Sequence, residues 1–391
     1  MSELNNLIKN MPGFKILIVD DKANMRRTMR NMLRLLGFNS FREADDGDNA
    51  LQKLRSEKFD FVICDWNMPR MNGLEVLRSV RQDDRFKDIP FMMVTAEVEE
   101  STVAESIEAD VDGYVIKPLL PTTLETKMIE ILTRKLTPSP LETHLQVAEV
   151  LLKARSIVAV HQELDKAAQI SPRSPKVFFF RGLAFEAQGD LDNAEKAFAA
   201  ARQFGPKFIR AHEKLAEILE KQGRQSEMVE ILKEVVRVSP KNAERQTKLG
   251  QALLADGRIQ EAKKAFNFAV QLEPDNYERK TAIGEAYLAH GLAQDAENAF
   301  KSSIETNPDD VYVYNRLGIA FRRQKKFEEA IQYYLKALSI DPEEENLLYN
   351  LARAYLGAQK TEPAVGALKK AIKIEPEFKE ARSLLAKIQS R

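Results

Sequence analysis

Five polar side chains that stand at the ends of short apolar runs could together handle a phosphoryl group. In chain order they are Asp20, Asp21, Asp65, Thr95 and Lys117. Three carboxylates in one pocket would repel one another, and a divalent cation such as Mg2+, which prefers oxygen ligands, would relieve that repulsion. A metal, a hydroxyl and an ammonium group around a carboxylate suit the charge of phosphoryl transfer. The residue types therefore indicate phosphoryl chemistry.

These side chains can meet only if a sheet brings the ends of its strands together. Near-continuous apolar runs, which are typical of strands buried on both faces of a parallel sheet, alternate with helical stripes. The predicted strands are 14–20, 60–65, 89–96 and 113–118, and the predicted helices are 25–38, 73–82, 99–108 and 123–136. This alternation predicts a doubly wound α/β domain, in which ligands lie beyond the carboxyl ends of the strands.

After a predicted linker at 137–140, the sequence changes to a repeat of 34 residues. The proline column is Pro172, Pro206, Pro240, Pro274, Pro308, Pro342 and Pro376. A small-residue column contains Gly182, Ala216, Gly250, Gly284, Gly318 and Ala352, and the aromatic column contains Phe198, Phe266, Phe300 and Tyr334. A turn column contains Gly189, Gly223, Gly257 and Gly291. The pattern predicts pairs of closely packed helices, each pair ended by a proline.

This period and pattern resemble the tetratricopeptide repeat. The resemblance covers six repeats at 175–378, preceded by a degenerate repeat at 141–174 and followed by a capping helix at 379–391. It implies an all-α solenoid whose groove binds an as yet unknown protein or peptide. The candidate groove residues are Phe179, Leu183, Glu213, Glu217, Thr281, Asn315, Ile319, Tyr349 and Arg353. Some of these positions could instead pack between repeats.

The first domain also resembles a known family. The stretches DWNMPRMNGLEVL at 65–77, MVTAE at 93–97 and GYVIKP at 113–118, together with the acids at 20 and 21, resemble the receiver domains of bacterial response regulators, and especially the CheY-like chemotaxis type. The resemblance implies a flavodoxin-like domain of five parallel strands at 14–136, which leaves 1–13 as a tail.

The resemblance also implies a role for each acid. Asp65 would accept a phosphoryl group from a histidine kinase. Asp21 and Asp65, with the backbone carbonyl of Asn67, would hold Mg2+, and Asp20 would assist through water.

Further roles follow for the residues around the acceptor. Lys117 would pair with phosphorylated Asp65, and Thr95 would bond its oxygens. Tyr114 would be the aromatic switch, although it could be simply a packed aromatic residue. Asn67 and Glu97 would tune dephosphorylation.

Residues 97–116 depart from the chemotaxis pattern, because this stretch has seven acids and no lysine or arginine. It includes Asp112 and is interpreted as an acidic face, which puts binding to a flagellar motor in doubt. A sharper hypothesis is that it docks on basic residues of a later repeat. Those residues are Arg322, Arg323, Lys325 and Lys326.

Composition excludes several other classes of function. The chain has 391 residues, with 59 basic and 59 acidic side chains and no formal net charge, which argues against a nucleic-acid partner. Its single cysteine, Cys64, excludes an intrachain disulfide and a multi-cysteine zinc site. No secretory signal and no apolar stretch of about 18 residues is present, so we expect a cytoplasmic protein without a membrane partner.

The sequence therefore predicts a two-component response regulator whose output is protein binding. An alternative is a repeat scaffold in which the receiver mainly serves for docking. An enzyme that hydrolyses an external phosphate substrate ranks last, because no second substrate pocket is visible, and only self-dephosphorylation of Asp65 is expected.

Overall fold

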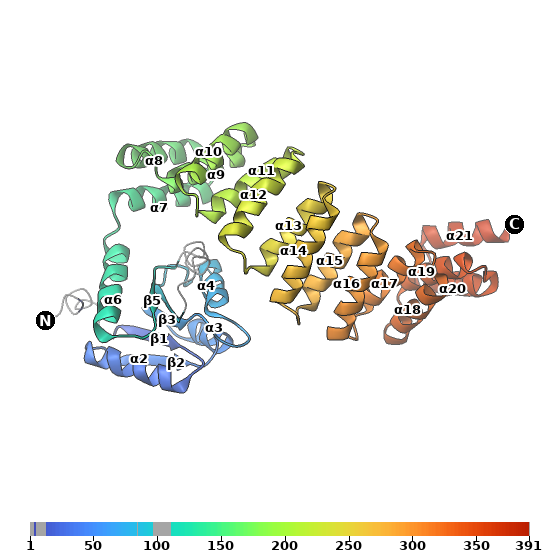
Figure 1. The fold of residues 1–391 in the computed structure, drawn as a ribbon, viewed down its shortest axis with the longest axis horizontal. Helices are drawn as coiled ribbons and strands as arrows, with labels where there is room; N and C mark the ends of the chain where they lie inside the picture. The colour runs from blue at the N-terminus through green and yellow to red at the C-terminus, as the bar shows by residue number, and fades with distance from the viewer. Residues whose placement is uncertain (1–3, 5–12, 84, 97–110, 391) are drawn as a thin grey trace. The chain divides into compact units, whose positions relative to one another are not determined.

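The computed structural model describes residues 4, 13–83, 85–96 and 111–390 (Figure 1). The chain divides into two compact units, one of residues 1–224 with 237–240 and the other of residues 225–236 with 241–391. The first unit contains the α/β domain and the first helical pairs, and the second contains the later helical pairs. Among the described residues, no helix is both long enough and apolar enough to cross a bilayer.

The α/β domain is built on one sheet of five parallel strands. The strands are β1 (Lys15–Val19), β2 (Ser40–Ala44), β3 (Phe61–Asp65), β4 (Phe91–Thr95) and β5 (Gly113–Ile116). Their order is β2-β1-β3-β4-β5, and every neighbouring pair is parallel. This topology confirms the predicted doubly wound, five-stranded fold, with β1 and β3 adjacent near its centre.

Helices cover both faces of this sheet. They are α2 (Ala23–Leu35), α3 (Gly47–Ser56), α4 (Gly73–Gln82) and α6 (Pro121–Leu136). One core joins α2 and α6 to alternate strand residues such as Ile16 and Ile63. The other core joins α3 and α4 to the intervening residues, which include Val62 and Cys64. The strand period of two thus supplies both cores, and Cys64 is a buried core thiol.

Two elements of this domain have no counterpart among the predicted ranges. β2 (SFREA) is an edge strand in which only Ala44 is buried, so its sequence lacks the apolar run of a central strand. α3 follows it, with Asp46 as its N-cap. The predicted helix at 99–108 lies outside the described residues. Leu4, which falls in the predicted tail, is fully buried in the core with α2 and α6.

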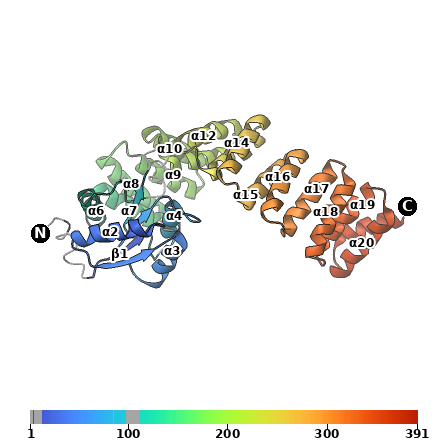
Figure 2. The same ribbon diagram turned by 60° about the horizontal axis from the view of Figure 1, so that its bottom comes forward.

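The rest of the chain is helical. The first unit continues with α7 (Pro140–Lys153), α8 (Ile157–Ile170), α9 (Pro175–Gln188), α10 (Leu191–Phe204) and α11 (Ile209–Lys221). The remaining helices are α12 (Gln225–Val238), α13 (Ala243–Ala255), α14 (Ile259–Leu272), α15 (Tyr277–Ala289), α16 (Ala293–Thr306), α17 (Val311–Arg323), α18 (Phe327–Ile340), α19 (Glu345–Gly357), α20 (Thr361–Ile374) and α21 (Lys379–Gln389). Figure 2 shows successive helices of the second unit stacked side by side. This arrangement confirms the predicted helical array.

The periodic prolines and glycines have clear structural roles. α10 ends at Phe204, two residues before Pro206, and α16 likewise ends two residues before Pro308. The turn glycine Gly189 has a φ of 79°, in the left-handed region that favours glycine. Each helical pair therefore has a turn inside it and a proline just beyond it.

The small column and the aromatic column meet inside each pair. A Cβ added to Gly182 would overlap the ring of Phe198, and the same holds for Gly318 and the ring of Tyr334. Where alanine replaces the glycine, the large partner is smaller as well, as at Ala148 and Leu164, which share one buried core. The two columns therefore vary together in size, which preserves close packing.

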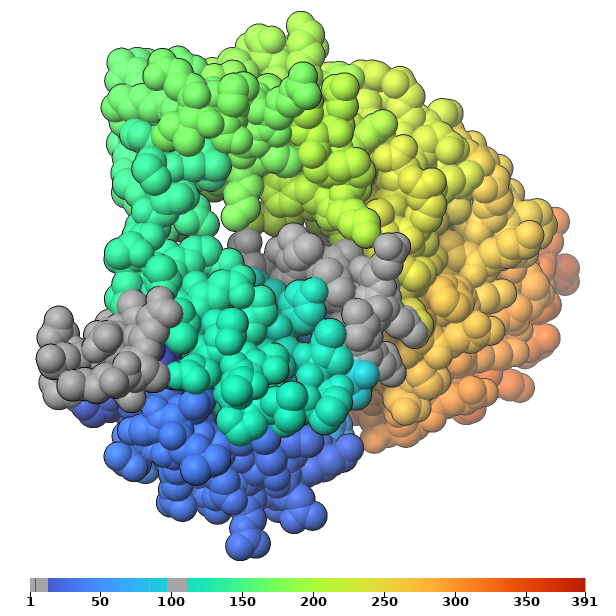
Figure 3. Space-filling view, turned by 60° about the vertical axis from the view of Figure 1, so that its left-hand side comes forward, coloured from blue at the N-terminus to red at the C-terminus, as the bar shows by residue number. Residues whose placement is uncertain are grey.

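The first helical pair begins earlier than its predicted boundary. α7 starts at Pro140, because proline is tolerated in the first turn of a helix, and Ser139 and Glu142 form a capping box there. Pro140 is therefore helical rather than part of a linker. Val147 and Val150 on α7 and Val158 on α8 are exposed (the two helices are green in Figure 3).

Candidate functional site

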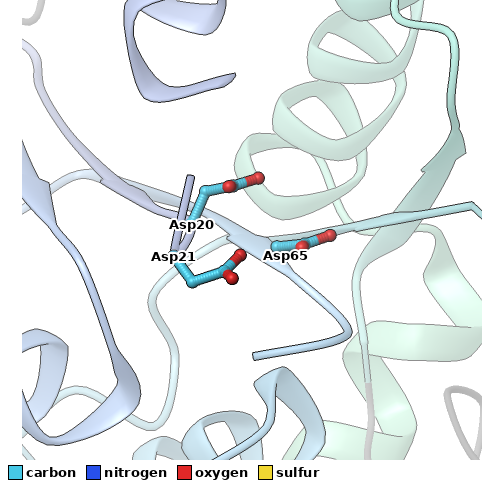
Figure 4. A group of neighbouring side chains, drawn as sticks. All are labelled: Asp20, Asp21 and Asp65. Carbon is cyan, nitrogen blue, oxygen red and sulfur yellow. The ribbon is translucent and has the colours of Figure 1, made fainter. Parts of the chain in front are cut away.

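The ends of β1 and β3 bring three carboxylates together. Asp20 and Asp21 follow β1, and Asp65 is the last residue of β3, its neighbour in the sheet. One carboxylate oxygen from each residue lies within 4.8 Å of the others. Figure 4 shows the three side chains close together at these strand ends. Asp20 and Asp65 are buried, at 0% and 3% exposure, so their charges are largely shielded from water.

Lys117 supplies the positive charge of the site. It follows β5, and its Nζ lies 2.9 Å from Asp65 Oδ1 and 3.4 Å from Asp20 Oδ2. The peptide between Lys117 and Pro118 is cis. Thr95, the last residue of β4, is buried, and its carbonyl accepts a bond of 2.7 Å from the Lys117 backbone N–H. All five residues that were expected to share a site therefore lie at the carboxyl ends of the strands.

Burial governs the electrostatics of this cluster. It raises the pKa of Asp65, the nearby charge of Asp20 adds to that rise, and the hydrogen bond from Lys117 opposes it without cancelling it. Burial also lowers the pKa of Lys117, but its bonds and charge pairs with Asp65 and Asp20 outweigh this effect and leave the pKa raised. One ammonium group thus only partly compensates the acids, and a further cation would be stabilised here.

The donor set fits a magnesium ion. Asp21 Oδ1 is buried and accepts no hydrogen bond from any described residue. An acceptor oxygen in this state is costly unless it finds a partner, and a metal ion is one such partner. Asp20 Oδ1 already accepts the backbone N–H of Lys22 at 2.8 Å. Mg2+ typically takes one or two carboxylates and keeps several waters, so Asp21 and Asp65 are suitable direct ligands.

The loop after β3 is tied closely to the acceptor. Asn67 is exposed in this loop. Asn72 caps α4 and forms a capping box with Glu75, which gives the asparagine a structural role. A Cβ on Gly73 would overlap the carbonyl oxygen of Asp65, so only glycine allows α4 to begin this close. Gly73 is thus a positioning residue that was not among the predicted site residues, although a glycine before an amphipathic stripe is a usable signal.

The remaining receiver candidates lie around this site. Tyr114 is half-buried, opposite Met93 in the β4–β5 register, and packs against the core beneath α3 and α4. Its contribution to switching stays a prediction. Glu97 lies outside the described residues.

Asp112 corrects part of the predicted acidic face. It is 9% exposed, and its Oδ2 accepts bonds from the Phe91 backbone N–H at 2.8 Å and from Arg81 at 2.7 Å. Its Oδ1 lies 3.1 Å from Lys135 Nζ, and its carbonyl accepts a bond from Arg134. Asp112 therefore joins α4, β4 and α6 at the amino-terminal ends of the strands, whereas the acid cluster lies at their carboxyl ends. It is a buried, paired acid and not part of a solvated surface.

The candidate groove residues of the first unit occupy different environments. Phe179 is 2% exposed and packs against the rings of Phe198 and Phe208, so it belongs to the interior and not to a groove. Leu183 and Glu213 are half-buried. Glu217 is exposed and pairs with Lys214 at 2.7 Å.

In the second unit, only part of the candidate set forms a common surface. Thr281 bonds Ser303 at 2.7 Å, Asn315 accepts a bond of 3.0 Å from Asn350, and Ile319 is half-buried. Tyr349 and Arg353 line one hollow together with Arg322, a member of the predicted basic cluster of the later repeat. In that cluster, Arg323 bonds the Leu288 carbonyl and Lys326 pairs with buried Glu297 at 3.0 Å.

A parallel sheet of this order, with an acid cluster facing a lysine at its strand ends, defines a receiver domain, and here a helical repeat array follows it. Family models match the response regulator receiver domain at residues 16–129, a tetratricopeptide repeat at 159–207 and the C-terminal domain of cilia and flagella-associated protein 70 at 203–391. The chain belongs to the response regulator family through a CheY-like receiver domain and continues into tetratricopeptide repeats.

Two relatives carry this assignment. The chemotaxis protein CheY-3 of Vibrio cholerae is 48% identical over 128 residues, which are 33% of this chain and 96% of that protein. The chemotaxis protein CheY of Pseudomonas aeruginosa is 50% identical over 120 residues, 31% of this chain and 97% of its own. A solved structure, the C-terminal part of a tetratricopeptide repeat protein from Cytophaga hutchinsonii, covers 61% of this chain and 98% of its own, with 18% identity and a TM-score of 0.49.

Proposed function

We propose that this protein is a two-component response regulator in which phosphorylation of Asp65 changes protein–protein interactions. The observation that carries the proposal is the arrangement of Asp65 between the two acids after β1 and the ammonium group of Lys117. The donor is a histidine kinase, as for receiver domains in general. The repeats are the part of the chain that binds a protein partner.

The transfer step follows from the positions of the side chains. A carboxylate oxygen of Asp65 attacks the phosphorus of a phosphohistidine, a P–O bond forms, and the P–N bond breaks with its electron pair moving to the imidazole nitrogen. Lys117 lies within bonding distance of Asp65 and would hold an oxygen of the transferred group. Thr95, at the neighbouring strand end, would donate its hydroxyl to another.

Asp21, Asp65 and the backbone carbonyl of Asn67 would hold Mg2+, with Asp20 assisting through water. A bound magnesium ion would neutralise charge on the phosphoryl oxygens. The raised pKa of Asp65 means that the ionised nucleophile is disfavoured when the site holds no cation besides Lys117. A bound metal ion should therefore lower the pKa of Asp65, and ionised Asp65 should raise the affinity for the metal.

In the proposed switch, a change at Thr95 on β4 would alter the position of Tyr114 on β5. Movement of the Thr95 hydroxyl toward the phosphoryl group would open space that Tyr114 can enter, because the two residues lie on adjacent paired strands. Ligand-induced change of this kind shifts a pre-existing equilibrium. Asn67 and Glu97 would set the lifetime of the phosphoryl group.

A scaffold role, with the receiver acting mainly as a docking module, is the alternative. Phosphotransfer distinguishes the two. Full-length protein is incubated with phosphoramidate and Mg2+, and phosphorylation is followed on a phosphate-affinity gel. We expect labelling of the wild type that is abolished by EDTA and by Asp65→Asn. Asp48→Asn, which removes an exposed acid in the first turn of α3, is the matched control and should label like the wild type. Undiminished labelling of Asp65→Asn would contradict the proposal.

A further inference from the structure

A hollow in the second unit is lined by two arginines together with aromatic and aliphatic side chains. It measures about 480 Å3 and is lined by α17, the start of α18, α19 and α21. Its lining residues are Arg322, Phe327, Tyr349, Arg353, Leu356 and Leu384. Two arginines thus face one opening among four largely apolar side chains.

Neither arginine has a carboxylate partner in the part of the chain that the structure describes. Among the residues that the structure describes, no carboxylate pairs with Arg322 or Arg353, and Arg322 Nε is buried without a hydrogen-bond partner. The surrounding repeats behave differently, because Arg316 forms a two-pronged ion pair with Glu285 and Lys326 pairs with Glu297. Two guanidinium groups left without acids at one opening are a recognition surface for carboxylates.

The arginines and their aromatic neighbours are held in place. The Arg353 guanidinium lies 5.7 Å from the centre of the Tyr349 ring, and the ring centres of Tyr349 and Phe378 are 5.3 Å apart. Phe327 packs so closely against Gly357 that a Cβ there would overlap its ring. A stacked guanidinium loses less freedom on binding than a free side chain, so this opening is partly preorganised.

The buried tyrosine Tyr334 of α18 lies close to both arginines of the hollow. The hydroxyl of Tyr334 is buried, and Arg322 lies close enough to it for hydrogen bonding to contribute to the pKa of the tyrosine. Burial raises its pKa, and the charges of Arg322, Arg353 and Arg316 oppose that rise because they lie nearby. Among the residues that the structure describes, Arg316 pairs with Glu285, whereas no carboxylate pairs with Arg322 or Arg353.

We propose that this hollow binds an acidic segment of a partner protein, with glutamate or aspartate side chains bonded to Arg322 and Arg353 and an apolar side chain against Leu356 and Leu384. This proposal rests on the proposed function, in which the repeats bind a protein. The aromatic and aliphatic side chains beside the arginines offer a peptide contacts that a free phosphate could not use, and the two guanidinium groups favour side-chain carboxylates. The site therefore specifies the charge and composition of the partner.

The test uses the full-length protein and three acetylated pentapeptides that carry a neutral dye. The first is Glu-Leu-Glu-Leu-Glu amide, the second is Gln-Leu-Gln-Leu-Gln amide, and the third is the glutamine peptide with a free C-terminal carboxylate. Fluorescence anisotropy gives the affinities. We expect the glutamate peptide to bind most tightly and to weaken as salt is raised, because the contacts are charged.

Variants locate the site. Arg353→Gln and Arg322→Gln should each weaken binding of the glutamate peptide at least about tenfold, since each loses charge-assisted hydrogen bonds. Arg353→Lys should lie between these variants and the wild type, because it keeps the charge and loses the planar fork. Arg382→Gln on α21 removes the same charge from an arginine that pairs with Glu377 and should bind like the wild type. Thermal unfolding verifies that each variant is folded. If Arg322→Gln does not fold, Arg353→Gln still tests the site, because Arg353 is exposed.

Equal affinity of the glutamate and glutamine amides, or equal weakening by Arg382→Gln, would overturn the proposal. Tighter binding of the free-acid glutamine peptide would instead assign the site to a chain terminus. Phosphorylation of Asp65 is measured on the same samples. If the wild type is labelled at Asp65 but does not bind the glutamate peptide, the peptide site is rejected and the proposed function stands. If the wild type binds the peptide but is not labelled, the proposed switch is rejected and the peptide site stands.

Discussion

The two parts of this chain build function in opposite ways. In the receiver, Asp20, Asp65 and Lys117 are far apart in sequence. The parallel sheet brings a carboxylate oxygen of each aspartate within 4 Å of Lys117 Nζ. In the repeats, the important contacts are local and recur, as between Gly182 and Phe198 and again between Gly318 and Tyr334. The receiver concentrates its chemistry at one point that depends on the whole sheet, whereas the repeats spread a surface over many similar units.

This difference predicts different responses to damage. A sheet whose contacts are non-local should unfold as one cooperative body, while an array in which each repeat contacts its neighbours can open piece by piece. The following variants test that contrast.

The largest effect should come from removing a buried ring in either part. Phe61→Ala in β3 and Phe198→Ala in α10 each empty a fully buried site and should cost about 3–5 kcal/mol of unfolding free energy. Hydrogen exchange should rise throughout the receiver for Phe61→Ala, and only around α9, α10 and their neighbours for Phe198→Ala. Leu35→Ala, at a residue 79% exposed, is the control. Uniform exchange across the repeats for Phe198→Ala would contradict the contrast.

A smaller effect tests the size rule of the repeats. Gly182→Ala should cost about 1–3 kcal/mol, because the new methyl overlaps the Phe198 ring. Adding Phe198→Leu should recover part of that loss, since the chain already pairs Ala148 with Leu164. Chemical denaturation of the two single variants and the double variant measures the coupling. Strict additivity would mean that the two columns pack independently.

How much of this molecule can be predicted from its sequence depends on whether a signal is local. The acid cluster was found because each member ends a recognisable run, and the repeats were found because their period is strict. β2 was missed since an edge strand needs little apolar sequence. Asp112 was misassigned because its partners Arg81 and Lys135 lie on other elements, and no spacing reveals them.

The repeat groove shows the same limit. Phe179 occupies a groove slot by position, yet its ring is drawn into the interior by Phe198 and Phe208. Arg322 and Arg353 are placed by phase, but whether a carboxylate pairs with them depends on every neighbouring side chain, and none among the described residues does. Position in a repeat therefore predicts where a residue stands, and packing decides what it contacts.

A turn residue offers a gain of stability in the repeats. Lys325 has a φ of 62° in the slot that holds glycine elsewhere, and a left-handed conformation is unfavourable for a residue with a Cβ. Lys325→Gly should therefore raise the unfolding free energy by up to about 1 kcal/mol, whereas Lys325→Ala should not. Thermal denaturation of the two variants measures the difference, and an equal response to both would rule out backbone strain as the cause.

The smallest effect on stability concerns the acceptor itself. The folded-state pKa of Asp65 is raised by burial, so the folded protein binds more protons than the unfolded one between the ordinary carboxyl pKa and the raised value. Stability should fall as the pH rises through that window, and Asp65→Asn should remove this part of the dependence. Denaturation at several pH values without Mg2+ should show Asp65→Asn more stable than the wild type near neutral pH. A wild type that is more stable there would contradict the assigned direction.

The central claim is that a phosphoryl group on Asp65 changes the interacting surfaces of the chain. Hydrogen exchange of the full-length protein with Mg2+, with and without the phosphoryl mimic beryllofluoride, tests it most directly. We expect altered exchange in residues 111–136 and at further sites within 141–390 for the wild type, and no change for Asp65→Asn. Unchanged exchange throughout 141–390 would exclude coupling to the repeats within the chain, and unchanged exchange in the receiver as well would contradict the claim.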